Sequence, residues 1–266
     1  MYQTTYHRAS SVDEAASLFA KGSEAKFLAG GQTLLPVMKQ RLASPSDVID
    51  LGKIKELIGV EASGDTLTIK AATPHYDVAT SDAAKKAIPA LAYLASLIGD
   101  PAVRYRGTIG GSIANNDPAA DYPAATLALG ATVKTNKRSI AADDFFKGLF
   151  TTALEDGEII TAVSFPVPQK AGYAKMPHPA SRFALTGVFV AQTKSGEIRV
   201  AATGASQSGV MRVPAIEAAL KANWSPSAID GVTISASGLL SDIHGSSDYR
   251  ANLVKVMAQR AVAAAT

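Results

Sequence analysis

Two separated glycine-bearing segments restrict most strongly what this chain can form. The first covers residues 28–34 (LAGGQTL), and the second runs through residues 104–121 (RYRGTIGGSIANNDPAAD). Glycine permits positive φ angles and lets another group approach the backbone closely. In both segments the glycines stand beside small hydroxyl residues. Each segment therefore predicts a turn whose backbone amides and hydroxyls can hold an anion.

The first segment lies between a predicted strand over Phe27–Ala29 and a predicted helix over Leu34–Gln40. Free amides at the start of a helix favour a phosphate oxygen, and Thr33 adds a hydroxyl donor. The pattern matches neither the G-x-G-x-x-G fingerprint nor the P-loop. For this segment taken alone, an ordinary tight turn with a glycine pair explains the pattern equally well.

The second segment is richer in ligand-binding groups. Residues 108–112 are predicted to wrap diphosphate oxygens with backbone amides, and Asp117 and Asp121 to accept hydrogen bonds from ribose or ribityl hydroxyls. A metal site fits less well, because the segment has no histidine and two aspartates alone underfill a site. A surface loop rich in turn-forming residues is the alternative. Two separated loops suit a dinucleotide better, because a diphosphate needs donors from more than one direction.

Composition excludes several classes of protein. Of the 266 residues, 47% are hydrophobic and 18% charged, so the chain can bury a core. The net charge of +3 is spread over scattered basic residues, which argues against nucleic-acid binding. Without cysteine, the chain itself can hold no disulfide, thiolate zinc site or iron–sulfur cluster. We find no signal peptide and no stretch of roughly 20 apolar residues, so we expect a soluble, cytoplasmic protein without a membrane span.

The hydrophobic pattern predicts an α+β fold in three consecutive parts, over residues 1–55, 56–168 and 169–266. Ser11 and Glu14 have the spacing of a capping box, and alternation over Thr66–Ala71 predicts a half-buried strand. Further helices are predicted over 76–86, 89–99 and 123–129, after Pro214, and from Tyr249 towards the C-terminus. Further strands are predicted over 48–51, 132–135, 158–165, 183–193 and 197–203, the last two as a hairpin.

The same glycine segments carry a family resemblance. Residues 29–34 resemble the A-G-G-[QHN]-[ST]-L signature of the FAD-binding, medium subunit of molybdenum hydroxylases, the xanthine dehydrogenase and aerobic carbon monoxide dehydrogenase type. Residues 108–112, followed by Asp117-Pro118-Ala119-Ala120-Asp121, resemble its T-I-G-G-x stretch with a trailing D-P-x-x-D. The likeness extends along nearly the whole chain, to Asp248-Tyr249-Arg250 at the start of the last helix.

The resemblance implies two α+β subdomains that hold FAD between them, as in vanillyl-alcohol oxidase-like (PCMH-type) flavoproteins, and a C-terminal α+β domain like that of carbon monoxide dehydrogenase flavoproteins. It implies no catalytic acid–base residue and no metal ligand on this chain. The implied cofactor-binding residues are Ala29, Gly30, Gly31, Gln32, Thr33, Leu34, Thr108, Ile109, Gly110, Gly111, Ser112, Asn115, Asp117, Asp121 and Phe183.

The chain departs from the family pattern near these positions. The family often has His and Ala where this chain has Asn115 and Asn116, and Gln and Asn where it has Ala102 and Tyr105. The resemblance implies that these positions flank the cofactor. Arg182 or Phe183 is expected to approach the isoalloxazine, with a surface charge and a core residue as the alternative. The histidines (His7, His75, His178 and His244) are dispersed and are interpreted as structural.

The implied function is electron transfer within a heterotrimer. A large molybdopterin-binding subunit would oxidise the substrate, a small iron–sulfur subunit would pass electrons to FAD on this chain, and FAD would pass them to an external acceptor. A self-contained flavin oxidoreductase of the same wider fold and a non-catalytic nucleotide-binding module are the alternatives. From the sequence we also expect Gly110→Val to abolish flavin retention and leave the fold largely intact.

Overall fold

A small parallel sheet with two helices forms the N-terminal part of the computed structural model, which describes all 266 residues. Its elements are β1 (Thr5–Arg8), α1 (Val12–Phe19), β2 (Lys26–Leu28), α2 (Leu34–Lys39) and β3 (Asp47–Asp50). β3 lies between β1 and β2 and is parallel to both. Ser11 caps α1, since its side chain accepts the Glu14 amide, and Ala15 of this helix packs into a small core with Ile49.

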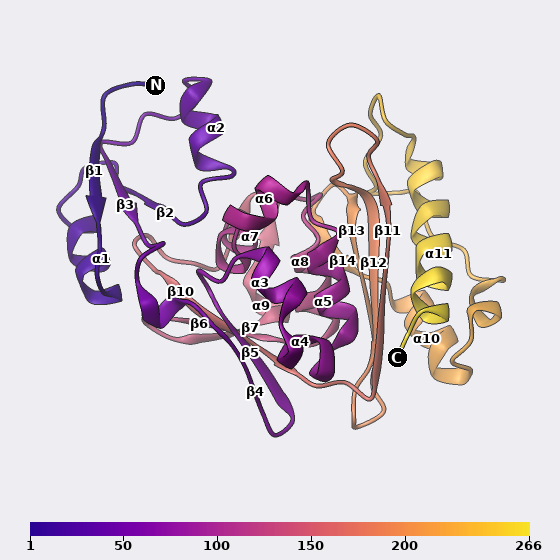
Figure 1. Ribbon diagram of the computed structural model, residues 1–266. Coiled ribbons are helices and arrows are strands. Elements are labelled where there is room, and N and C mark those ends of the chain that lie inside the picture. The colour runs from indigo at the N-terminus through magenta and orange to yellow at the C-terminus, as the bar shows by residue number, and fades with distance from the viewer.

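The middle of the chain forms a five-stranded antiparallel sheet covered by helices (Figure 1). Its strand order is β4-β5-β10-β6-β7. The strands are β4 (Val60–Ser63), β5 (Thr66–Lys70), β6 (Thr132–Thr135), β7 (Ser139–Ala141) and β10 (Ile160–Pro166), with a short 3-10 turn at Lys55–Leu57 before them. The helices are α3 (His75–Thr80), α4 (Asp82–Ala87), α5 (Pro89–Ser96), α6 (Pro101–Arg106), α7 (Ile109–Asn115), α8 (Tyr122–Ala128) and α9 (Ala142–Phe145). A two-stranded hairpin, β8 (Phe146–Gly148) and β9 (Thr151–Thr152), follows α9.

A four-stranded antiparallel sheet forms the last part, and Figure 1 shows it between the middle helices and the C-terminal helices. Its strands are β11 (Lys170–Pro177), β12 (Ala184–Gln192), β13 (Ile198–Ser206) and β14 (Gly209–Arg212). The helices are α10 (Pro214–Ala222) and α11 (Ser247–Ala263), with a 3-10 turn at Pro226–Ile229. Neighbouring side chains of a strand point to opposite faces, so Phe189 packs in the core of the middle part and Val190 under α10 and α11. This double burial fixes the C-terminal sheet against the middle helices.

The elements predicted from sequence are present, but the structure divides one helix in two and adds others that were not predicted, among them β1, β4, β7, β14, α6 and α9. The single helix predicted over 76–86 is two helices, because Ser81 is extended (ψ 123°) and caps α4. The glycine-rich stretch predicted as a loop contains α7, which Thr108 caps. No strand was predicted over Lys170–Pro177, yet β11 pairs along its whole length with β12. The division at residues 55 and 168 remains a prediction.

Candidate functional site

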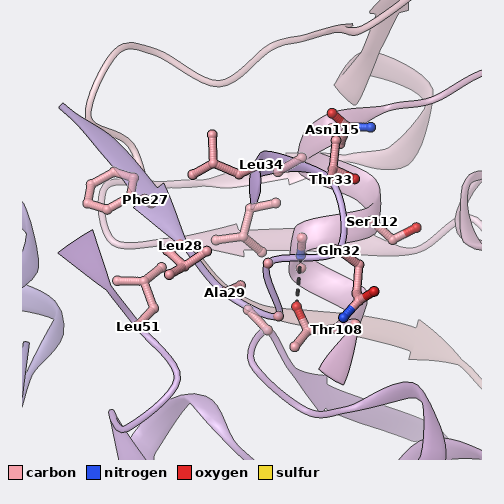
Figure 2. Close-up of a pocket in the computed structure, with 18 of the residues that line it drawn as sticks. Phe27, Leu28, Ala29, Gln32, Thr33, Leu34, Leu51, Thr108, Ser112 and Asn115 are labelled. Carbon is pink, nitrogen blue, oxygen red and sulfur yellow. Dashed lines mark hydrogen bonds between the residues drawn. The ribbon is translucent and has the colours of Figure 1, made fainter. Parts of the chain in front are cut away.

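A cavity of about 720 Å³ lies where the N-terminal sheet, the middle helices and the loop between β11 and β12 meet. All of the predicted cofactor-binding residues line it except Ile109, which is fully buried in the core of the middle part. Figure 2 shows apolar Phe27, Leu28 and Leu51 on one side of this space, with polar Thr108, Ser112 and Asn115 on the other. The cavity thus offers an apolar wall and a polar wall to one ligand.

The first glycine segment presents a row of free hydrogen-bond donors. The backbone amides of residues 29–34 donate to no acceptor in the protein, so they are available to a ligand. The segment is the turn between β2 and α2, and Gly31 has φ +74°, which favours glycine. Consecutive free amides beside a helix start form a binding place for an anion.

The two segments touch through their backbones. A Cβ atom at Gly30 would lie 1.9 Å from the carbonyl oxygen of Arg106 and 2.7 Å from Cα of Gly107. Across the same contact, a Cβ at Gly111 would lie 3.7 Å from Cβ of Ala29. In Figure 2 the first segment passes beside Thr108 at the start of α7. Gly30 is therefore required for the close approach that brings both segments to one cavity.

The second segment uses its amides for its own structure. The amides of Gly110, Gly111 and Ser112 donate to Ala71 O (2.9 Å), Thr108 Oγ1 (3.1 Å) and Thr108 O (3.0 Å), respectively. The predicted wrapping of a diphosphate by these amides is therefore not available in this conformation. What remains for a ligand is side chains: the Ser112 hydroxyl and the Asn115 amide make no hydrogen bond within the protein.

Gly110 packs against the backbone of the middle sheet. A Cβ there would lie 2.6 Å from Cβ and 2.7 Å from O of Ala71. The expectation that Gly110→Val leaves the fold largely intact is therefore wrong, since a larger side chain would push α7 away from the end of β5. Gly111 has more room: its nearest neighbour would be Thr108 Oγ1 at 3.1 Å.

The two aspartates differ in how freely they face the cavity. Asp121 is almost fully buried and is engaged by β11, since it accepts from the Tyr173 hydroxyl at 2.5 Å and forms an ion pair with Lys175 at 3.0 Å. Burial raises its pKa, which Lys175 and Tyr173 partly oppose. Asp117 is only partly buried, and one of its oxygens accepts the Ala119 amide at 2.8 Å. Asp117 is the freer acceptor of the two.

Several residues expected beside the cofactor lie elsewhere. Asn116 is buried and points to the β8–β9 turn, where its amide donates to the carbonyls of Gly148 (2.7 Å) and Thr151 (2.9 Å). Tyr105 is exposed and stacks on Tyr76. Neither these residues nor Ala102 and Arg182 line the cavity, in contrast to Asn115 and the half-exposed Phe183.

The fold also adds residues that the sequence analysis did not select. His75 lines the cavity, is 4% exposed and makes no side-chain hydrogen bond; burial lowers its pKa from 6.5 to about 4, and Arg104 adds to this. Residues 154–160 form a further wall, where Arg138 (3.1 Å) and Thr135 (2.7 Å) fix Glu158. No short motif marks these residues, which reach the cavity through the pairing of β10 with β5 and β6.

Comparison with known proteins identifies the family. Residues 2–168 match the model of the FAD binding domain in molybdopterin dehydrogenase. The chain belongs to this family. It is 36% identical to the carbon monoxide dehydrogenase medium chain of Hydrogenophaga pseudoflava, over 98% of this chain and 96% of that one. It is 35% identical to the nicotine 6-hydroxylase medium subunit of Paenarthrobacter nicotinovorans, over 97% and 95% of the two chains.

Solved structures agree with this assignment. The reconstituted carbon monoxide dehydrogenase from Oligotropha carboxidovorans superposes with a TM-score of 0.91 at 32% identity, covering 99% of this chain and 97% of that one. Quinoline 2-oxidoreductase from Pseudomonas putida 86 superposes with a TM-score of 0.83 at 29% identity, covering 98% and 96%. The α+β fold and the membership in the FAD-binding subunits of molybdenum hydroxylases are thereby confirmed, and with them the role as an oxidoreductase subunit.

The residues of the cavity fit FAD. The row of free amides at residues 29–34 suits a diphosphate, and the wall of Phe27, Leu28 and Leu51 suits an aromatic ring system. The His, Asp and Glu side chains form no group of three or more that could hold a metal ion. None of the helices is both long and apolar enough to cross a bilayer.

Proposed function

We propose that the first glycine segment binds the diphosphate of FAD through the amides of residues 29–34, and that the second contributes side chains, mainly Ser112 and Asn115. Thr33 and Thr108 add hydroxyl groups to the same wall, and Asp117 accepts from a sugar hydroxyl. The observation that carries this proposal is the run of amides with no acceptor in the protein, beside a cavity of about 720 Å³. The Gly30–Arg106 contact holds the two segments at a fixed separation.

Phe183 lines the cavity from the β11–β12 loop and is half-exposed. We place the redox-active ring of FAD on the side of Phe183, away from the first segment. Bound FAD supplies the chemistry of accepting and passing on electrons. The chain itself orients the cofactor, encloses it between an apolar and a polar wall and limits its contact with water. No acid–base pair is needed on this chain, because no substrate bond is broken here.

We further propose that this chain works between two partner subunits, a large one with molybdopterin and a small one with iron–sulfur clusters, and that it passes electrons to an external acceptor. Similarity over nearly full length to chains named as medium subunits supports a multi-subunit complex. The absence of cysteine requires that any thiolate-held cluster sit on another chain. It also fits a reducing compartment, and we propose the cytoplasm.

The substrate is proposed to be chosen on the molybdopterin subunit. Relatives of nearly equal identity are named for carbon monoxide (36%) and for nicotine (35%). The overall similarity of this chain therefore does not distinguish between the two substrates. The test is to exchange this chain between two such complexes: substrate preference should stay with the large subunit.

The direct test is the visible absorption spectrum of the purified full chain after incubation with FAD and removal of free cofactor. We expect one FAD per chain, identified by chromatography after release by heat. Co-purification of tagged chain with the two proposed subunits, and reduction of its flavin by their substrate, tests the electron path. An assembled complex without flavin would contradict the proposal.

A further inference from the structure

The loop that carries Phe183 is held by a pair of histidines from distant parts of the sequence. His178 begins the β11–β12 loop and His244 lies in the loop before α11, yet Nε2 of His178 is 3.2 Å from Nδ1 of His244. The rings meet edge to face, with centroids 4.4 Å apart. No local sequence pattern predicts this contact, because the two residues are 66 positions apart.

Hydrogen bonds within the loop assign the direction of the contact. Nδ1 of His178 accepts the backbone amides of Ala180 (3.3 Å) and Ser181 (3.2 Å), so this nitrogen carries no proton. In the neutral ring the proton is then on Nε2, which donates to Nδ1 of His244. One ring thus organises the turn of its own loop and at the same time fastens the loop to a second segment.

The loop needs such support because its conformation is not a relaxed one. Arg182 has φ +61°, in the left-handed region that non-glycine residues seldom adopt. The loop closes through the His178 amide, which donates to Phe183 O at 2.8 Å, and through the Ser181 hydroxyl, which accepts the Phe183 amide at 3.3 Å. Each of these bonds fixes the backbone of Phe183 directly. Strained residues persist where surrounding contacts over-determine them.

The segment on the other side of the contact is itself anchored in the fold. Asp242 Oδ1 accepts the amide of His244 at 2.8 Å, and its Oδ2 accepts from Arg250 at 2.7 Å. The Arg250 side chain is nearly buried and also donates to Leu185 O (2.7 Å) and Gly204 O (2.6 Å). Leu185 is two residues after Phe183. The loop is therefore fixed at its start by His244 and just after its end by Arg250.

We propose that His178 and His244 are positioning residues, which hold Phe183 at the rim of the cavity in the place where it meets the bound cofactor. The inference rests on the proposed placement of FAD, with the ring on the side of Phe183. Loss of the histidine contact would free the loop, and Phe183 would spend less time at the rim. The affinity for FAD and the asymmetric environment of the flavin would change together.

The test uses the full chain, with any subunits that co-purify, and two readouts: the Kd for FAD and the visible circular dichroism of bound FAD. We expect His244→Ala to raise the Kd about threefold to fivefold, the factor that one neutral hydrogen bond is worth, and to reduce the dichroism. His244→Asn keeps an acceptor near the position of Nδ1 and should restore most of both signals. His7→Ala is the matched control, because it breaks a histidine contact with Asp47 (2.6 Å) on the N-terminal sheet.

The decisive step is to repeat the comparison in a Phe183→Ala background. If the histidines act through Phe183, His244→Ala should then change neither the Kd nor the dichroism further. An unchanged signal in His244→Ala alone, or an equal loss in both backgrounds, would overturn the positioning role. A different outcome would contradict the proposed placement of FAD: Phe183→Ala alone would then leave the Kd and the dichroism as they are in the unmodified chain.

Discussion

The two glycine segments look alike in sequence and do different work in the fold. In the first, the amides of residues 29–34 have no acceptor in the protein. In the second, the amides of Gly110, Gly111 and Ser112 are all bonded within the protein. Glycine in the first segment permits a turn that exposes donors, whereas Gly110 in the second permits a helix to lie on a strand. A glycine-rich motif therefore indicates that another group lies close to the backbone. Whether that group is a ligand or another part of the protein is shown by the hydrogen-bond partners of the backbone amides.

The difference follows from what surrounds each segment. The first joins β2 to α2 in a sheet of three short strands, with the cavity beside it. The second lies between the end of β5 and the buried helix α8, so protein acceptors such as Ala71 O are within reach. We infer that ligand affinity depends mainly on the first segment, and that the second mainly maintains the wall on which its side chains stand.

The largest effect should come from Gly110→Val. Its side chain would overlap the Ala71 backbone, and overpacking at such a site costs about 3 kcal/mol in the free energy of unfolding, the upper end of the usual range. We expect poor yield of folded chain and a strongly lowered midpoint in urea. Gly111→Ala, one residue on, should fold, because the added Cβ meets only side-chain atoms, Thr108 Oγ1 at 3.1 Å and Ala29 Cβ at 3.7 Å. Equal stability of the two variants would contradict the structural role of Gly110.

The free energy of unfolding should also fall at acidic pH, because His75 packs against the second segment. This residue donates its amide to Gly107 O at 2.9 Å, and its ring fills the space beside Gly107. With a pKa of about 4 in the folded chain and 6.5 in the unfolded chain, the unfolded chain binds the proton first. Stability from neutral His75 is complete above pH 6.5 and is lost as pH falls towards 4, by about 3 kcal/mol.

Urea unfolding of the unmodified chain and of His75→Gln, at pH 7.5 and at pH 4.5, measures this contribution. We expect the variant to lose less stability over the interval, because Gln does not titrate. A parallel loss in both proteins would show that other groups account for the acid sensitivity.

Sequence reasoning found the parts of the site that are local in the chain. Residues 29–34 can be identified because a strand, two glycines and a helix start follow one another in the sequence, and all of these residues line the cavity. Thr108 was also identified, but the helix that it begins, α7, was missed because glycine and asparagine are poor helix formers. The helix forms nevertheless, since the Thr108 side chain caps its first turn. The α+β class followed from period-2 and period-3.6 patterns, which the buried faces of the sheets require.

What depends on tertiary contact could not be read from the chain. Asp121 was expected to bind a sugar, but the ion pair with Lys175 comes from β11, a strand that the sequence did not reveal. His75 was interpreted as structural, and its position at the cavity follows from the bond to Gly107 O. Asn116 stands next to a cavity residue but has a left-handed backbone, φ +46°, which turns its side chain towards the β8–β9 hairpin.

A smaller change in the first segment tests its role as the source of donors. Gly31→Ala forces a side chain at φ +74° and towards the Leu35 side chain, which would turn the neighbouring amides. We expect about tenfold weaker FAD binding, roughly 1.4 kcal/mol, with a modest loss of stability. Gly196→Ala is the matched control, since it has φ +86°, nothing within 4 Å and a position on the β12–β13 turn. Isothermal titration with FAD compares them; equal affinities would remove the first segment from the binding site.

The smallest effect separates the side chains of the second segment from its backbone. Ser112→Ala removes a hydroxyl that bonds to nothing in the protein, so stability should stay within about 0.5 kcal/mol of the original, while FAD binds about threefold to fivefold more weakly. Thr108→Ala also removes the cap of α7 and should cost about 1 kcal/mol in stability, which Thr108→Ser restores. We expect Ser112→Ala to change the affinity for FAD alone, and Thr108→Ala to change both affinity and stability. That result would show that ligand binding by the side chains of this segment can be separated from its structural role. If Ser112→Ala leaves the Kd unchanged, the Ser112 hydroxyl does not contact the cofactor, and the proposed contribution of the second segment falls to its other cavity-lining side chains, such as Asn115.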